Sequence, residues 1–224
     1  MAPDNAASLF SADKYGIGQS VSRMEDPTLL TGKGRYTDDI NLPGQAHGVM
    51  VRSQIAHGVI NSIDLDGALE MPGVLAVYTI EDMDAAGYGN LQCGAVNTNR
   101  DGTPMHKPSR PTLARGRVRH VGDPIAFVVA ETRVQARDAA EAIYVDITQL
   151  AAVTDPLAAV APDAEQIWPE AANNIALDFH FGDADAVAKA FTDAAHVTRL
   201  ELINNRVVVS AMEPRVAVVE FDAW

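Results

Sequence analysis

The chain has 224 residues, of which 47% are hydrophobic and 21% are charged, proportions typical of a globular protein with one or two domains. The formal net charge is −13, from 17 basic and 30 acidic residues, which argues against a nucleic-acid partner because such proteins gather Lys and Arg on one face. Cys93 is the only cysteine, so an internal disulfide is excluded, and this chain by itself cannot hold an iron–sulfur cluster, which takes several thiolates.

The N-terminal stretch has no basic segment followed by an apolar run, which a signal peptide would need. No apolar segment approaches the length of a membrane span. We therefore expect a cytoplasmic protein that has no membrane partner.

A polar lead-in arm, assigned to residues 1–31, precedes turns around a short extended piece at Arg35 and Tyr36. From Ala46 to Leu65 apolar and polar residues alternate in two runs, with residues 56–58 between them as a turn. This alternation is typical of two paired strands, so we expect a hairpin here.

Residues 65–70 fit one helical turn that the sequence MPG ends, and the β-rich apolar run at residues 74–79 predicts a buried strand. A short acidic turn follows. Residues 85–117 are rich in Gly, Pro, Asn and Ser and show no sustained period, so we interpret them as a long loop. Loops of this length in a compact domain are usually functional or disordered.

A strand at residues 125–130 leads into a helix that begins after Thr132, because Thr132 and Gln135 fit a capping box. The apolar stripe of this helix consists of Ala136, Ala139, Ala140 and Ile143. A dinucleotide site needs its glycines between strand and helix, whereas here the glycine precedes the strand and Glu131 occupies the junction, where its charge repels phosphate. We therefore interpret this unit, with a further strand up to Ile147, as scaffold.

Residues 156–173 contain three prolines and are interpreted as a linker. A second unit starts at Asn174 with a strand-like stretch at residues 175–182 and a helix capped by Asp183. One face of that helix carries Val187, Ala190, Phe191 and Ala194. Further β-rich stretches follow at residues 196–203, 206–210 and 215–222. Because no closing helix follows, we expect this unit to be an incomplete domain in a protein of the α+β class.

The chain has six histidines: His47, His57, His106, His120, His180 and His196. No pair has the spacing of a zinc-binding HExxH helix, and no Cys–His zinc pattern occurs, so we expect no metal site in this chain alone. His57 and His120 adjoin predicted strands and are expected at turns or sheet edges. A GxSxG elbow and a Walker A loop are missing, and Gly32 and Gly34 are interpreted as a turn.

Other polar residues have structural interpretations. The adjacent carboxylates of residues 25–26 and 38–39 point apart in extended chain, so we expect them to be solvated rather than catalytic. Glu213 and Arg215 flank a proline and are expected to form a structural ion pair across a turn. Cys93 has no neighbouring base that would activate a thiolate, so we expect a passive loop residue.

Five stretches, in this order, are informative together: SVSRMEDPTLLTGKGRYTDDINLPG, VMVRSQIAHGVINSID, ALEMPGVLAVYTIEDM, VRHVGDPIAFVVAETRVQARDAAEAIYVDITQLAAVTD and AMEPRVAVVEFD. They resemble the N-terminal part of the large, molybdenum-cofactor-binding subunit of the xanthine dehydrogenase, aldehyde oxidase and carbon monoxide dehydrogenase family. The resemblance implies an α/β-hammerhead domain at residues 32–155 and the beginning of a molybdopterin-binding domain at residues 174–224.

Members of that family oxidise aldehydes, heteroaromatic rings or carbon monoxide with water as the oxygen source. The resemblance implies a molybdopterin-type molybdenum cofactor in the complete enzyme, with 2Fe-2S clusters and FAD on partner chains or domains. The expected partners are the catalytic remainder of the large subunit and the iron–sulfur and flavin subunits. No stretch matches the family's pterin-binding loops or general base, so we expect this chain alone to bind no cofactor and to be inactive.

In some relatives the loop after the IEDM-like turn reaches the substrate channel, and the corresponding stretch here is LQCGAV. The resemblance thus gives as channel candidates Leu91, Gln92, Cys93, Ala95 and Val96. A loop that only covers a subunit seam is the alternative. Two other functions stay open: a stand-alone hammerhead interaction module that has lost redox chemistry, and a small hydrolase that uses Cys93 with a histidine.

Overall fold

The computed structural model describes residues 23–205, 207–211, 213 and 215–222. The described residues fall into two units: residues 23–43 together with the described residues from 203 onward, and residues 44–202. They are described separately below.

The described part of the first unit contains one short helix, α1 (Asp26–Leu30), and one 3-10 turn, η3 (Thr37–Asp39). Tyr36 has an extended backbone, as expected, but no strand forms there, because its N–H is taken by the Asp39 carboxylate at 3.0 Å at the start of the 3-10 turn. The predicted extended piece is therefore not part of a sheet.

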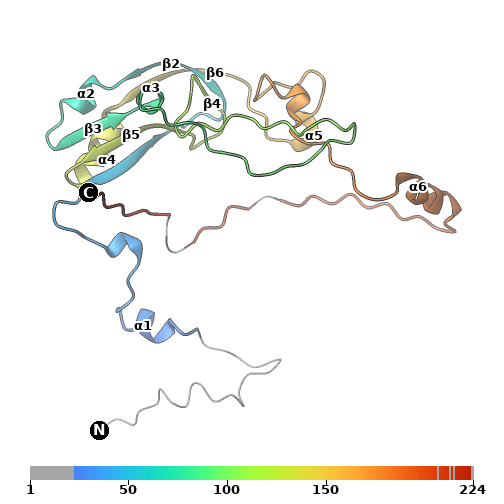
Figure 1. Ribbon diagram of the computed structural model, residues 1–224, viewed down its shortest axis with the longest axis horizontal. Helices are drawn as coiled ribbons and strands as arrows, with labels where there is room; N and C mark the ends of the chain where they lie inside the picture. Colours follow the sequence, from blue (N-terminus) through green and yellow to red (C-terminus); the bar gives the residue numbers. More distant parts are fainter. Residues whose placement is uncertain (1–22, 206, 212, 214, 223–224) are drawn as a thin grey trace, which may run out of the picture. The chain divides into compact units, whose positions relative to one another are not determined.

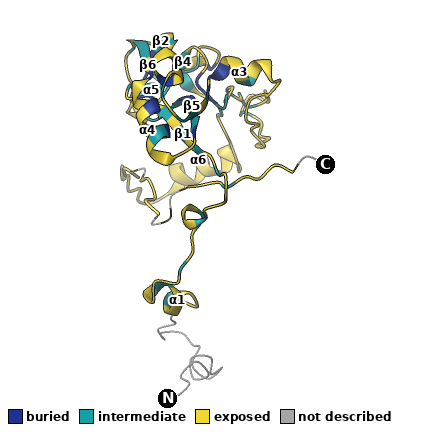
Figure 2. Ribbon diagram, turned by 90° about the vertical axis from the view of Figure 1, so that its left-hand side faces the viewer, coloured by how far each residue is buried: buried dark blue, intermediate teal, exposed yellow. Residues whose placement is uncertain are grey.

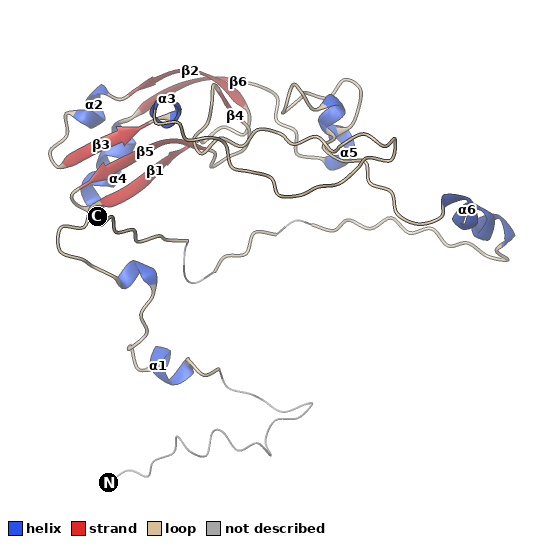
Figure 3. Ribbon diagram, viewed as in Figure 1, coloured by secondary structure: helices blue, strands red, loops and turns tan. Residues whose placement is uncertain are grey.

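The second unit contains two three-stranded antiparallel sheets (Figures 1 and 3). The first has the order β1–β5–β3 and the second the order β4–β2–β6. The strands are β1 (His47–Arg52), β2 (Gly58–Asp64), β3 (Val74–Tyr78), β4 (Arg117–Val118), β5 (Pro124–Ala130) and β6 (Tyr144–Gln149). Short helices accompany these sheets, which confirms the α+β class.

The hairpin predicted at residues 46–65 is wrong. Both strands exist, but β1 pairs with β5, whereas β2 pairs with β4 and β6 in the other sheet. The connection between them does not fold into a hairpin turn, because the Ser53 hydroxyl donates to the Ile55 carbonyl at 2.7 Å and accepts from the Ile55 N–H at 3.0 Å. This local turn sends the chain from one sheet into the other.

Three helices accompany the sheets: α2 (Asp66–Leu69), α3 (Ile80–Ala85) and α4 (Arg133–Ala142). The Thr132 hydroxyl accepts from the Gln135 N–H at 3.2 Å, which confirms the predicted N-cap of α4. Ala136 and Ala139 are fully buried, and their small side chains let α4 approach the β1–β5–β3 sheet closely. The buried residues concentrate in this part of the unit (Figure 2).

Two apolar clusters fill the core. One joins α4 to β5 through Ala126, Val128 and Ala139. The other joins Ile125 of β5 to Val118 of β4, and side chains of β2 and β6 pack against it. The strand interpreted as scaffold thus contributes to both clusters, and the helix contributes to the first.

The connector after β6 is held by side-chain hydrogen bonds. Asp155 caps α5 (Pro156–Ala159) by accepting from two backbone N–H groups. Asn174, at φ 55°, donates to the carbonyls of residues 159 and 165 and accepts from the Ile167 N–H at 2.9 Å. The 3-10 turn η4 (Ala172–Asn174) ends the segment. One asparagine therefore closes the connector on itself.

The strands predicted after residue 174 are not formed in the described residues, where α6 (Ala184–Asp193) is the regular element. Asp183 caps α6 as predicted, with its carboxylate accepting from the Ala186 N–H at 2.9 Å. A β-rich stretch becomes a strand only where another strand pairs with its backbone, and the described residues supply none. Val187 and Phe191 are 54% and 63% exposed, so the apolar face of α6 is uncovered (Figure 2).

None of the helices in the described ranges combines the length and the hydropathy that a bilayer span requires.

Candidate functional site

Helix α3 replaces the acidic turn predicted after residue 79, because a capping box stabilises it. Asp82 accepts from the Thr79 N–H at 2.7 Å and from the Thr79 hydroxyl at 3.2 Å. Thr79 is buried and its hydroxyl is engaged, so it is not available as a nucleophile. Gly87, at φ 78°, then turns the chain out of the helix into the long loop.

The far end of the long loop returns to α3 through an ion pair. The Arg115 guanidinium binds the Asp84 carboxylate with both terminal nitrogens, and Nη2 to Oδ1 measures 2.7 Å. The hydrogen bond from Arg115 lowers the pKa of Asp84 below its ordinary value, and the same bond raises the pKa of Arg115. Both side chains are roughly half exposed, so the pair fixes the loop ends more than it stabilises the fold.

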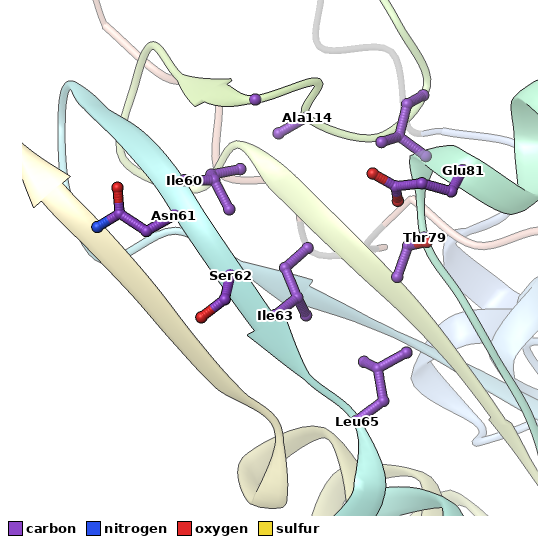
Figure 4. Close-up of a pocket in the computed structure, with 10 residues that line it drawn as sticks. Ile60, Asn61, Ser62, Ile63, Leu65, Thr79, Glu81 and Ala114 are labelled. Carbon is purple, nitrogen blue, oxygen red and sulfur yellow. The ribbon is translucent and has the colours of Figure 1, made fainter.

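A groove of about 270 Å³ lies beside this pair, between β2 and the start of α3 (Figure 4). Ile60, Ile63 and Leu65 point into the groove, and Ala114 closes its side. The exposed carboxylate at its rim belongs to Glu81. An apolar floor with one carboxylate suits the packing of an apolar group, and the lining residues offer no nucleophile–base pair.

Asn61 and Ser62 belong to the same stretch of β2 but point away from the groove (Figure 4). Asn61 Nδ2 donates to Asp146 Oδ2 at 3.1 Å and to Thr148 Oγ1 at 2.9 Å on the neighbouring strand β6. The irregular register of β2 between Ile60 and Ser62 separates these two orientations. Both residues border the groove, but their side chains point away from it, and the Asn61 side chain ties β2 to β6.

The long loop is an arm that folds back on itself. Leu91 N–H donates to the Arg110 carbonyl at 2.7 Å near the base, and an isolated bridge joins Thr98 to Pro104 near the tip. Gly102, at φ 86°, makes the turn at the tip. The predicted loop thus has internal pairing that its irregular composition did not indicate.

The five channel candidates lie at the base of this arm, and all are exposed. Val96 is 86% exposed and Leu91 55% exposed, and none of the five lines the groove beside α3. Lys107 Nζ donates to the carbonyl of Cys93 at 3.4 Å. The candidates are therefore neighbours along one exposed ribbon, and their role at a substrate channel stays a prediction.

A second hollow, of about 470 Å³, lies between the arm tip and residues 170–178. Its lining includes three carboxylates, of Asp101, Glu170 and Asp178. The Asp101 pKa is lowered below its ordinary value, chiefly because its carboxylate accepts from the Thr103 hydroxyl. The acidic lining disfavours an anion.

His57 was predicted at a turn or sheet edge, and it does lie in the bend directly before β2. The prediction did not include its burial, to 1% exposure. Its Nδ1 lies 3.0 Å from the Ala151 carbonyl and its Nε2 lies 3.4 Å from Arg117 Nη1. A carbonyl only accepts, so Nδ1 carries the proton and Nε2 accepts from Arg117. The ring thus joins β4 and the chain after β6 to the start of β2. The signal that could have drawn attention to it is the repeated sequence AHGV at residues 46–49 and 56–59.

Within the part of the chain that the structure describes, no three His, Cys, Asp or Glu side chains gather to hold a metal ion. Lys107 contacts the backbone carbonyl of Cys93 and not its thiol. Among the described contacts, none places a base beside this exposed thiol. His120 is exposed and lies 3.8 Å from Asp123, as expected of a turn residue. The Glu213–Arg215 ion pair stays a prediction, and Glu213 Oε1 accepts from the Thr37 N–H at 3.3 Å.

The fold of the second unit leads to the family of the chain. Two small antiparallel sheets with short helices carry a long arm. The family model for the aldehyde oxidase and xanthine dehydrogenase a/b hammerhead domain matches residues 31–151, more than half of the chain. The chain belongs to this family.

Two solved structures and one curated relative illustrate the likeness. The nicotine 6-hydroxylase large subunit of Paenarthrobacter nicotinovorans is 35% identical over 210 residues, which cover 92% of this chain and 24% of the relative. A Cu,Mo-CO dehydrogenase structure has a TM-score of 0.60 at 32% identity and covers 83% of this chain and 24% of its own. Quinoline 2-oxidoreductase from Pseudomonas putida 86 has a TM-score of 0.54 at 41% identity, covering 67% and 18%.

The first three curated relatives are matched over 24%, 25% and 26% of their own length, so this chain spans about a quarter of each. Their names describe a large subunit, subunit gamma of a dehydrogenase complex, and a large chain.

Proposed function

We propose that this chain is the N-terminal portion of the large subunit of a molybdenum-cofactor hydroxylase or dehydrogenase. The complete enzyme would oxidise an aldehyde, a heteroaromatic ring or carbon monoxide with water as the oxygen source. The observation that carries the proposal is the family match together with an alignment over 92% of this chain to a subunit four times as long.

In this proposal the chain has a structural and substrate-access role and is inactive alone. The described residues support that role, because they offer an apolar groove and an exposed arm. The exposed apolar residues after Leu200 also favour burial against further protein; they include Leu202, Val208, Val219 and Phe221.

The described residues do not fit a molybdopterin cofactor on their own. Its phosphate would need convergent N–H or cationic donors. The hollow near the arm tip has a carboxylate-rich lining instead, and its cation, Arg100, lies 3.5 Å from Asp178. The groove beside α3 has Glu81 at its rim and an apolar floor. The donors for the cofactor would therefore come from the catalytic remainder, and the 2Fe-2S and FAD groups from partner chains or domains. A cytoplasmic location completes the proposal.

Co-purification tests the assignment. The tagged chain is expressed in its native host, recovered, and assayed for molybdenum and for companion polypeptides. We expect molybdenum together with the remainder of the large subunit and with iron–sulfur and flavin subunits. A metal-free chain recovered alone, from a gene that does not continue into pterin-binding loops, would refute it.

The substrate-access role has its own test in the complete enzyme. Val96→Trp adds bulk at the arm base, and we expect a several-fold higher KM for a bulky substrate with a smaller effect on a small one, because access is sterically limited. Val134→Trp is the matched control, since Val134 is also exposed, at 67%, but lies on α4. Equal KM values in both variants and the parent would exclude a channel role for Val96.

A stand-alone interaction module is the second candidate, favoured by the exposed, unpaired backbone of residues 215–222 in the described part. Such a segment can add as a strand to the sheet edge of another protein. A monodisperse, metal-free monomer with slowly exchanging amides at residues 216–221 would support this module over the enzyme subunit.

A further inference from the structure

The arm has a single side chain that serves both its tip and a distant segment. Asn99 Nδ2 donates to the Thr103 hydroxyl at 3.1 Å and to the Pro104 carbonyl at 3.0 Å, which closes the tip. Its Oδ1 accepts from the Asp178 N–H at 2.9 Å, although 79 positions separate the two residues. All the side-chain hydrogen-bonding groups of Asn99 except one lone pair are thus used.

Two backbone hydrogen bonds reinforce this attachment. Arg100 N–H donates to the Asp178 carbonyl at 2.8 Å, and His106 N–H donates to the Ala176 carbonyl at 2.8 Å. Residues on both sides of the tip turn therefore contact residues 176–178. The Arg100–Asp178 ion pair, at 3.5 Å with both side chains about 60% exposed, adds little to the attachment.

The attachment and the closure of the tip depend on each other. Asn99 presents Oδ1 to Asp178 only while its amide plane is held by the two bonds from Nδ2 to Thr103 and Pro104. The backbone of Asn99 is also fixed, because its N–H donates to the Thr103 carbonyl at 2.8 Å. An arm whose tip opens would lose the orientation of this acceptor.

We infer that Asn99 couples the arm to residues 176–178, so that the arm tip and this segment open and close as one unit. The arm acts as a strap that fixes where the chain leaves the connector after Asn174. The exposed stretch Leu91–Val96 lies at the base of this arm. The inference rests on the described contacts and holds whether or not that stretch lines a substrate channel.

Hydrogen–deuterium exchange of the full chain tests this coupling. In the parent protein we expect slowed exchange in peptides covering residues 97–106 and 176–178. Asn99→Ala should speed exchange roughly tenfold in both peptides together, because one variant removes three hydrogen bonds that close the strap. The β5 peptide, residues 124–130, reports whether the core stays folded.

Two variants sharpen the test. Asn97→Ala is the matched control, since Asn97 is an exposed asparagine two positions away, and it should leave both peptides unchanged. Arg100→Ala removes the ion pair but keeps the backbone bonds, and exchange should change less than twofold. Faster exchange in the arm with residues 176–178 unaffected, or exchange of residues 176–178 in the parent at the rate of an unstructured peptide, would overturn the coupling.

Discussion

Replacing Gly58 with alanine tests the tight packing at the start of β2. Gly58 has no positive φ, so glycine is not needed there for backbone conformation. A Cβ at this position would lie 2.4 Å from Ile147 Cγ2 and 2.9 Å from the Thr148 carbonyl oxygen. The carbonyl belongs to the backbone of the neighbouring strand β6, so it cannot move aside without disturbing the sheet.

Overpacking of this kind costs about 1–3 kcal/mol, while the loss of unfolded-state freedom on Gly→Ala returns about 0.4–1 kcal/mol. We therefore expect Gly58→Ala to lower the free energy of unfolding by about 1–2 kcal/mol, measured by urea unfolding with circular dichroism. For a domain of this size the Tm should fall by roughly 3–8 °C.

Gly89→Ala is the control for this measurement, because a Cβ there meets no heavy atom within 4 Å and Gly89 has no positive φ. It should leave stability unchanged or raise it slightly. If Gly58→Ala were as stable as the parent, or if Gly89→Ala lost as much as Gly58→Ala, the steric reasoning about β2 and β6 would be wrong.

Three other variants probe the core, the connector and a surface pair. Ile125→Ala removes a side chain that is 1% exposed in the second core cluster, and urea unfolding should show a loss of about 2–5 kcal/mol. Arg119→Ala removes a guanidinium that lies 3.8 Å from the centre of the Trp168 ring and donates a hydrogen bond to the Ile167 carbonyl in the connector. We expect faster amide exchange across residues 156–174, because about 1–2 kcal/mol of stabilisation of the connector is lost. Unchanged exchange would contradict this role of Arg119. The folded-state pKa of Asp84 is lowered, so its contribution to the free energy of unfolding is present above its unfolded pKa and is lost as the pH falls through the lower folded value. Asp84→Asn should therefore show a smaller drop in urea midpoint between about pH 6 and about pH 2 than the parent. An equal drop would exclude the Asp84–Arg115 pair as a source of acid sensitivity.

Local signals in the sequence predicted the elements whose cause is local. Helix α4 follows from the Thr132 cap, whose partner Gln135 is three residues away, and from a stripe of alanines with helical spacing. Helix α6 follows in the same way from Asp183. The α+β class could therefore be predicted from the sequence.

Strand pairing could not be predicted in the same way, because its causes are distant in sequence. β1 has the alternation of a hairpin strand, yet its partner β5 is joined to it in register from His47↔Ala130. A strand's period says which face is buried but not which strand supplies the hydrogen bonds. The stretches after residue 195 have the same β-rich composition and find no partner in the described residues, so they form no strand.

The contacts of the arm could not be predicted from the sequence for another reason. Asn99 stands in a stretch rich in Asn, Gly and Pro, where several asparagines look alike. Only the three-dimensional arrangement brings Thr103, Pro104 and Asp178 to its side chain. Composition identified the loop as irregular and long, but its contacts with residues 176–178 depend on where the connector places that segment.

The two AHGV sequences show how far identical residues can differ in environment. In each, the glycine lies where a side chain of a neighbouring strand crosses: a Cβ on Gly48 would lie 2.3 Å from Phe127 Cζ, as one on Gly58 would meet Ile147. The histidines diverge, because only the second sheet brings the Ala151 carbonyl and the Arg117 guanidinium to the ring of His57. Both glycines therefore lie close to a neighbouring strand, but at Gly48 the atom met is the tip of a side chain, whereas at Gly58 a backbone carbonyl is met as well. The partner strands likewise decide that His57 is buried.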